Sequence, residues 1–247
     1  MKLKESCQKY CRYGSGELAR DADGGKYAKT KCLNSNVNLT KHMVNKYVRV
    51  TLACALAVLT AISAQISFKL GPVPYTMQNF AVILSGLLLG KFGAVAQLIY
   101  LGMIALGIPA GAGFRGGIGE LFGYTAGYFW MFPVSAFLMG LIREKAYRRG
   151  SLKELITLWI GSVVAVIPLY LVGFAVFYEF ASGSSGLMGW CESATRFFGI
   201  NLSPFWAVFF ATVLIFVPQD VFMDHVIAIV VFKYLHELLK QRGYDLP

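Results

Sequence analysis

The stretch Gly107–Tyr128 reads GIPAGAGFRGGIGELFGYTAGY, and it decides how the rest of the chain is interpreted. It is rich in glycine, carries charges only on Arg115 and Glu120, and has strongly apolar segments on both sides. Because each glycine in a helix costs about 1 kcal/mol relative to alanine, a stable helix is not expected here. At membrane depth, non-helical backbone is tolerated only where protein buries it or where it lines a wet cavity. The stretch therefore predicts either a loop whose bare N–H groups approach a polar ligand, or a re-entrant or surface loop without one.

The composition places the chain among membrane proteins. Of its 247 residues, 56% are hydrophobic and 15% aromatic, well above the habit of soluble domains. The net charge of +10 does not indicate a nucleic-acid partner, because 11 of the 23 basic residues precede residue 50 and no basic stripe with interleaved aromatics follows. The five cysteines show no regular framework, so a disulfide scaffold is not expected.

The first 42 residues differ from everything after them. They are polar and basic and lack apolar periodicity, which predicts a disordered extension before a membrane domain over 43–247. Met43 is an alternative start, in which case the extension is untranslated or dispensable. No short apolar core with a cleavage site precedes Val48, so a signal peptide is not expected. The spacing of the residues that could bind zinc fits no common finger, so no metal site is predicted; they are Cys7, Cys11, Cys32 and His42.

Six apolar segments follow, and most approach the roughly 20 residues that cross hydrocarbon as a helix. The second is short, and glycines near its end suggest close packing or a break. The segments cover about residues 47–66, 79–89, 92–108, 124–142, 155–178 and 204–232.

Charge gives the orientation of these segments. Five basic residues crowd the short connection 143–153 between the fourth and fifth segments, and such loops are cytoplasmic. Six crossings then place both termini in the cytoplasm and the loops 67–78, 109–123 and 179–203 outside. The predicted fold is an all-α membrane protein with six transmembrane helices, both termini cytoplasmic, and a glycine-rich outer loop between helices three and four.

Alanines recur at every fourth position along the first segment. Ala53, Ala57 and Ala61 form a small-residue face that allows another helix to approach closely. This helix is either a neighbour within the protein, which the spacing alone favours, or a helix of another chain. Two prolines then force an extended approach to the second segment, in which Gln78 is a polar group near the outer mouth.

The chain resembles the biotin-specific substrate-binding subunits, BioY, of energy-coupling-factor transporters. The resemblance covers about residues 47–145 and part of the last segment. It lies in the order and spacing of several motifs: the alanine-spaced first helix, Gly71-Pro72-Val73-Pro74-Tyr75-Thr76-Met77-Gln78, Leu87-Leu88-Leu89-Gly90, Gly107-Ile108-Pro109, Gly113-Phe114-Arg115-Gly116-Gly117 and Gly123-Tyr124-Thr125-Ala126-Gly127-Tyr128.

The resemblance implies capture of biotin from outside a prokaryotic plasma membrane, without catalysis, cofactor or metal. It also implies partners on other chains, a transmembrane coupling subunit and two ATPases, with Ala53, Ala57 and Ala61 as the coupling surface. The substrate-binding residues that it implies are Gly113, Arg115, Gly116, Gly117, Thr125, Tyr128 and Asp220.

Two departures from the family pattern leave the specificity open. The family's Gly-Pro-Thr-Gly-Gly-Tyr stands here as Gly123–Tyr128 with the proline and one glycine replaced, and the family's lysine three residues beyond the aspartate is Met223. The alternatives are a binding subunit of the same architecture for another small vitamin or metabolite, and a stand-alone secondary transporter. The latter is disfavoured by the absence of a visible inverted repeat.

Ionisable residues within the apolar segments are functional candidates by default. Asp220 is the strongest candidate for a ligand contact. For Asp224 and His225 the preferred interpretation is pairing with a neighbouring helix or a position near the cytoplasmic interface. Arg115 has two compatible roles: binding a ligand carboxylate bidentately or pairing with Glu120.

An enzyme is not predicted. Ser185 and His225 could be drawn as an intramembrane protease dyad, but such a serine should begin a helix inside the membrane, and Ser185 lies in a polar external loop. No phosphate-binding GxxxxGK[ST] motif occurs, so an ATP-driven function requires ATPase subunits on other chains.

Overall fold

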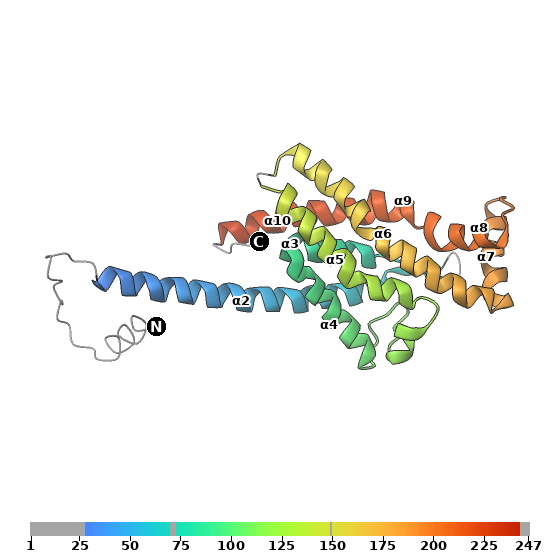
Figure 1. Ribbon diagram of the computed structural model, residues 1–247, viewed down its shortest axis with the longest axis horizontal. Helices are drawn as coiled ribbons and strands as arrows, with labels where there is room; N and C mark the ends of the chain where they lie inside the picture. Colours follow the sequence, from blue (N-terminus) through green and yellow to red (C-terminus); the bar gives the residue numbers. More distant parts are fainter. Residues whose placement is uncertain (1–27, 70–72, 149, 243–247) are drawn as a thin grey trace. The chain divides into compact units, whose positions relative to one another are not determined.

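The computed structural model describes residues 28–69, 73–148 and 150–242 (Figure 1). Contacts divide the chain into two units, residues 1–48 and 49–247, and the second unit is a bundle of helices. Within the described residues, five helical stretches are long and apolar enough to cross a membrane: Lys46–Gln65, Gln78–Ala105, Ala126–Ala146, Leu152–Ser182 and Pro204–Gln241. The prediction of a mostly helical membrane protein is confirmed.

Helix α2 (Ala28–Gln65) contains the first membrane stretch. The predicted domain boundary at residue 42 falls within this helix. The predicted disorder of residues 1–27 and the side chains of Cys32 and His42 lie outside the described part of the structure. Residues 28–42 of the extension predicted to be disordered are helical, and for residues 1–27 the disorder stays a prediction.

The stretch Gln78–Ala105 is a hairpin. Helix α3 (Gln78–Leu89) and helix α4 (Gly93–Ala105) are joined by the 3₁₀ turn η1 (Gly90–Phe92). In one continuous helix Ser85 and Gln97 would lie about 18 Å apart, but the Gln97 side-chain amide donates to Ser85 Oγ at 2.8 Å. The two helices coincide with the second and third predicted segments, while the count of six crossings stays a prediction.

Helix α5 (Ala126–Ala146) packs against α3, α4 and α6 (Leu152–Ser182). Small residues permit the contact with α3: a Cβ added at Gly86 would lie 2.4 Å from the Ala136 carbonyl oxygen, and one at Gly140 would lie 2.2 Å from the Gly90 carbonyl. The two backbones therefore touch, and there is no space for a side chain between them.

The sequence predicted a single membrane helix over residues 204–232. In the structure, the last membrane stretch is not one regular helix. Two π-helical turns interrupt it, and Pro218 lies between them, where it removes a further helical hydrogen bond. The elements are α8 (Pro204–Phe209), η3 (Phe210–Leu214), α9 (Val217–Gln219), η4 (Asp220–Asp224) and α10 (His225–Gln241).

Side chains from other elements satisfy carbonyl groups of this irregular stretch, as burial in hydrocarbon requires. The Tyr128 hydroxyl donates to the Thr212 carbonyl at 2.7 Å, and the Trp159 indole N–H donates to the Val221 carbonyl at 2.8 Å. The Tyr75 hydroxyl donates to the Ile215 carbonyl. These bonds fix the last stretch against α5, α6 and the loop that contains Tyr75.

Two of the three loops that the sequence predicts to lie outside, 67–78 and 179–203, contain secondary structure that the sequence analysis missed. The first forms an antiparallel pair of short strands, β1 (Ser67–Lys69) and β2 (Pro74–Thr76), so the fold is not strictly all-α. The third contains helix α7 (Ser185–Phe197), which begins where Ser184 Oγ accepts from the Leu187 N–H. The extended backbone at Pro74 agrees with the prediction from the prolines.

The small-residue face of α2 packs within this chain. Ala53 and Ala57 have no exposed surface and belong to the core that α3, α4 and α5 share, and Ala61 packs partly buried beside them. Because a partner helix cannot reach a buried methyl group, the coupling surface predicted at Ala53, Ala57 and Ala61 is not available at its first two positions. The interpretation that the spacing alone favoured, packing inside the protein, describes this arrangement.

This burial predicts the effect of enlarging Ala57. Ala57→Leu is expected to destabilise the protein by about 1–3 kcal/mol, because three extra carbons enter a filled core. Ala55→Leu is the matched control, since Ala55 lies on the exposed face of the same helix. Thermal unfolding in detergent measures both variants, and an unchanged melting temperature for Ala57→Leu would contradict the packing described here.

Candidate functional site

A pocket of about 620 Å³, its open mouth included, lies among the helices beneath the glycine-rich loop. Seven lining residues are apolar or aromatic: Val73, Pro74, Ala112, Phe129, Phe132, Leu169 and Phe216. Eight carry polar groups: Thr76, Gln78, Asn79, Arg115, Thr125, Tyr128, Tyr170 and Asp220. An apolar wall with a few convergent polar groups is typical of a ligand site.

Asp220 is the acidic group of the pocket, and only 3% of it is exposed. Two neutral donors reach the same carboxylate oxygen, Oδ2: the Asn79 side-chain amide at 2.5 Å and the Tyr170 hydroxyl. The buried carboxylate is thus stabilised by hydrogen bonds where the family pattern has a nearby lysine. Met223, at that lysine's position, is 42% exposed and does not line the pocket.

The N-terminus of α3 supports this acidic region. The backbone N–H of Phe80, in the first turn of α3, donates to Asp224 Oδ2 at 3.3 Å, and Asn79 precedes it. A helix N-terminus carries unpaired N–H groups and a partial positive charge, which stabilise carboxylates. Asp224 and His225 are both fully buried and contact neighbouring helices, as the interpretation of pairing with a neighbouring helix predicts, while their position relative to the cytoplasmic interface stays a prediction.

Tyr75 adds an aromatic contact next to the pocket. Its ring stacks between Phe68 and Phe216, with centroid distances of 4.7 and 4.3 Å. Burial first, and then the charge of Asp220, raise the pKa of Tyr75 to about 12. Tyr75 is therefore a neutral hydrogen-bond donor at physiological pH, as its bond to the Ile215 carbonyl requires.

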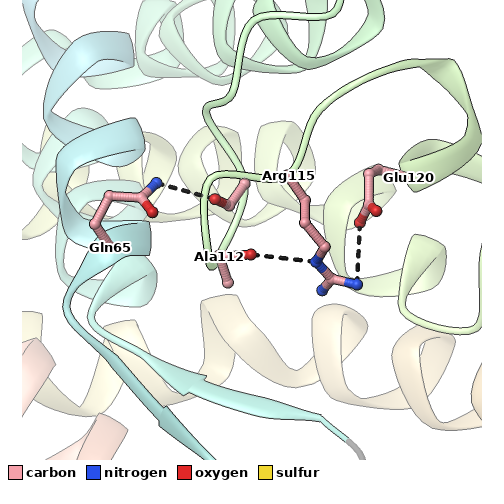
Figure 2. Close-up of polar contacts among 5 residues, drawn as sticks. Gln65, Ala112, Arg115 and Glu120 are labelled. Carbon is pink, nitrogen blue, oxygen red and sulfur yellow. Dashed lines mark hydrogen bonds and ion pairs between the residues drawn. The ribbon is translucent and has the colours of Figure 1, made fainter.

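The glycine-rich loop forms a tight turn over residues 111–115. The Gly111 N–H donates to the Arg115 carbonyl at 2.8 Å, and both Gly113 and Phe114 have positive φ angles. Figure 2 shows the side chain of Gln65, at the end of α2, reaching this turn. The prediction of non-helical backbone here is confirmed, except for the short 3₁₀ turn η2 (Ile118–Phe122).

Arg115 lines the pocket and has two contacts within the loop (Figure 2). Its Nε donates to the Ala112 carbonyl at 3.2 Å, and Nη1 lies 3.6 Å from Glu120 Oε2. The Arg115 side chain is 42% exposed, so this ion pair is weak. The pairing with Glu120 is present, and it leaves guanidinium donors available to an anion.

Of the other predicted substrate-binding residues, Thr125 and Tyr128 line the pocket, whereas the three loop glycines do not. Gly116 and Gly117 instead dock the loop onto the end of α4: a Cβ at Gly116 would lie 2.3 Å from the Ile108 carbonyl oxygen, and the Gly117 N–H donates to the Ile104 carbonyl at 2.8 Å. Gly113 supplies a φ of +68° to the turn. A direct contact of these glycines with substrate stays a prediction.

Sequence reasoning missed several residues of this site. Asn79 and Tyr170 contact Asp220 across separations of 141 and 50 residues, which no local pattern reveals. A signal was nevertheless present for both: Asn79 follows Gln78 at the expected outer mouth, and Tyr170 lies in the middle of an apolar segment rather than at its end. Gln65 likewise ends the apolar stretch that forms the second half of α2.

The proposed protease pair is not assembled. His225 Nδ1 lies 3.0 Å from the hydroxyl of Ser162, which donates to the Trp159 carbonyl. Ser185 is the first residue of α7 in the third outer loop. Among the described residues, no group of three metal-binding side chains comes together.

These features define a class: a multi-pass helical protein of the membrane with a pocket between its helices that polar and apolar side chains line together. The model of the BioY family matches residues 34–241. The chain belongs to the BioY family, which is a family of transporters of the cell membrane and not of enzymes.

Individual relatives agree with this assignment. A probable biotin transporter BioY of Pyrococcus horikoshii is 42% identical over 125 residues, which cover 50% of this chain and 70% of the relative. The biotin transporter BioY of Thermotoga maritima is 46% identical over 88 residues, which cover 35% and 52%. The crystal structure of the S-component for biotin from an ECF-type ABC transporter superposes with a TM-score of 0.58 at 22% identity, covering 78% of this chain and 92% of that one.

Proposed function

We propose that this protein captures biotin from outside the cell as the substrate-specific subunit of an ATP-driven energy-coupling-factor importer. The observation that carries the proposal is a pocket lined by both a buried carboxylate, Asp220, and a guanidinium, Arg115, in a member of the BioY family. Biotin offers a chemical counterpart to each, since its ureido ring presents N–H donors and its valeryl tail ends in a carboxylate. The aromatic and aliphatic wall suits the apolar thioether ring.

The direct test is ligand-induced stabilisation of the purified protein in detergent. Biotin at 100 times its dissociation constant is expected to stabilise the folded state by about 2.7 kcal/mol and to raise the melting temperature accordingly. The substitution of Met223 for the family's lysine favours one second candidate, another small vitamin. If excess biotin leaves the melting curve unmoved while another vitamin shifts it, the biotin assignment fails and the second candidate stands.

Because Arg115 lines the pocket, its substitution is expected to weaken the binding of biotin more than the binding of biotin amide. Arg115→Ala is expected to weaken binding of biotin by about 10- to 150-fold, because a charged hydrogen bond contributes about 1.5–3 kcal/mol. Biotin amide, which has no carboxylate, is expected to lose little. Isothermal titration with both ligands measures the ratio of their dissociation constants. Equal losses for the two would assign Arg115 to loop structure alone.

The topology and the partners belong to the same proposal. Six crossings with both termini in the cytoplasm follow if α3 and α4 each cross once, and the basic connection 143–153 favours that orientation. The related solved chain is described as an S-component of an ECF-type ABC transporter, which supports association with a coupling subunit and two ATPases. Co-purification with such subunits tests the association, and accessibility of cysteines introduced at 147 and 119 tests the sidedness.

The region before the family match is expected to be dispensable. The BioY model begins at residue 34, and the preceding sequence is polar and has little apolar surface to bury. Deleting residues 1–33 is therefore expected to leave membrane insertion and biotin binding nearly unchanged. Membrane fractionation and titration of the truncated protein provide the measurement, and loss of insertion would show that the segment has a structural role.

A further inference from the structure

We propose that Gln65 is a positioning residue that fixes the turn 111–115 and thereby holds Arg115 at the pocket. The ligand measurements below rest on the proposed function, while the structural measurement does not. Gln65 does not line the pocket, so it acts on the site only through the loop.

The side-chain amide of Gln65 connects the end of α2 to both sides of the turn. Its Nε2 donates to the Gly111 carbonyl at 2.9 Å, and its Oε1 accepts from the Phe114 N–H at 3.0 Å. Nε2 also donates to the Ala61 carbonyl of its own helix at 3.1 Å. Three of the four hydrogen bonds that a glutamine amide can form are thus made, two of them to the loop.

These partners allow only one orientation of the amide. Rotating it by 180° would place the oxygen against the two carbonyls of Ala61 and Gly111 and the NH₂ group against the Phe114 N–H. All three contacts would then pair like groups. The side chain therefore sets the position of the loop relative to α2 and does not merely touch it.

The turn itself needs such support. Phe114 is not glycine, yet it has a φ of +59°, a conformation that costs an L-residue about 1–2 kcal/mol. Its side chain is 69% exposed and so gains little from burial. A strained residue persists only when its surroundings fix it, and the bond from the Phe114 N–H to Gln65 Oε1 is one such constraint.

The turn determines where the guanidinium lies. Arg115 closes the turn through its carbonyl, which accepts from the Gly111 N–H, and its Nε donates to the Ala112 carbonyl inside the turn. Ala112 and Arg115 both line the pocket. If the turn shifts or unwinds, the guanidinium loses its place while Asp220, on a different element, keeps its own.

The experiment compares biotin with biotin amide in Gln65→Met, a change that keeps the side-chain length and removes all three hydrogen bonds. Binding of biotin is expected to weaken about tenfold, the loss of roughly one charged hydrogen bond. Biotin amide is expected to change less than about twofold, since it does not use Arg115. Gln65→Glu retains an acceptor for the Phe114 N–H but places an oxygen against the Ala61 and Gly111 carbonyls. This variant is also expected to weaken the binding of biotin more than the binding of biotin amide.

Gln97→Met is the matched control. Gln97 also makes side-chain hydrogen bonds inside the bundle, to Thr60 and Ser85, but it lies away from the loop and the pocket. This variant is expected to lower the melting temperature without changing the ratio of the dissociation constants of biotin and biotin amide. The positioning role would be overturned if both Gln65 variants kept the wild-type ratio of the two dissociation constants, or if both ligands lost the same affinity.

Hydrogen exchange of the ligand-free protein separates this proposal from the proposed function. The Phe114 amide is expected to be protected in the wild type and to exchange at least about tenfold faster in Gln65→Met, because opening of the turn then costs less. Unchanged protection would refute the role of Gln65. If the wild type binds no biotin, the proposed function fails and the exchange result still decides the role of Gln65.

Discussion

Asp220→Asn is expected to weaken biotin binding by about 10- to 150-fold, the equivalent of about 1.5–3 kcal/mol. Oδ2 of Asp220 accepts from both Asn79 and Tyr170. In the variant the amide oxygen must take this position, because the NH₂ group would otherwise oppose the Asn79 amide. The NH₂ group then replaces Oδ1 and presents a donor to the ureido N–H groups of the ligand, where an acceptor is needed.

Asp224→Asn provides the control for this prediction. Asp224 is equally buried and lies one helical turn further along, but it does not line the pocket. Substitution of Asp224 is expected to change the melting temperature and to leave the dissociation constant of biotin within about twofold, because Asp224 accepts its hydrogen bond from α3. Isothermal titration of both variants measures the difference. Full biotin affinity in Asp220→Asn would remove Asp220 from the ligand site.

Gly140→Ala is expected to be strongly destabilising, although it adds a single methyl group. The new Cβ would lie 2.2 Å from the Gly90 carbonyl carbon and oxygen, both of which are backbone atoms. Helices α3 and α5 must then separate, which forfeits the packing along their whole contact. We expect a loss of about 3 kcal/mol or more, at the upper end of overpacking costs.

Gly102→Ala is the matched control, because a Cβ at Gly102 in α4 meets no atom within 4 Å. There the same substitution is expected to be neutral or to stabilise by up to about 1 kcal/mol through helix propensity. Thermal unfolding of the two variants in detergent gives the comparison. Similar melting temperatures would show that the α3–α5 contact is looser than the structure indicates.

The positions of the membrane stretches and of the non-helical, glycine-rich turn along the chain could be predicted from the sequence. Long apolar runs and dense glycine are local signals, and the structure places helices and a non-helical turn where those signals occur. The π-helical turns of the last stretch could not be predicted, because they arise where side chains from other elements, such as Tyr128 and Trp159, satisfy the released carbonyls. The burial of Ala57 was equally undetermined, since alanine spacing does not say which helix approaches.

For the pocket, the sequence indicated the charged members and the pairing of Arg115 with Glu120, and it missed the partners of Asp220 and the contacts of Gln65. Asp220 and Arg115 are conspicuous because charges are rare in apolar surroundings. Asn79, Tyr170 and Gln65 are neutral and ordinary in composition, and their importance lies in contacts with residues distant in sequence. The sequence also did not show which group takes the place of the family's lysine near Asp220. In the structure, Asn79 on α3 donates a hydrogen bond to this carboxylate.

Helix α3 is a short, rigid helix with a close contact at each of its ends. Its first turn binds the carboxylate of Asp224 and carries Asn79, whereas Gly86 and the following Gly90 fit against α5 without clearance. Twelve residues of helix span only about 18 Å and bend little. A displacement of α5 is therefore expected to shift α3, and with it the acidic wall of the pocket.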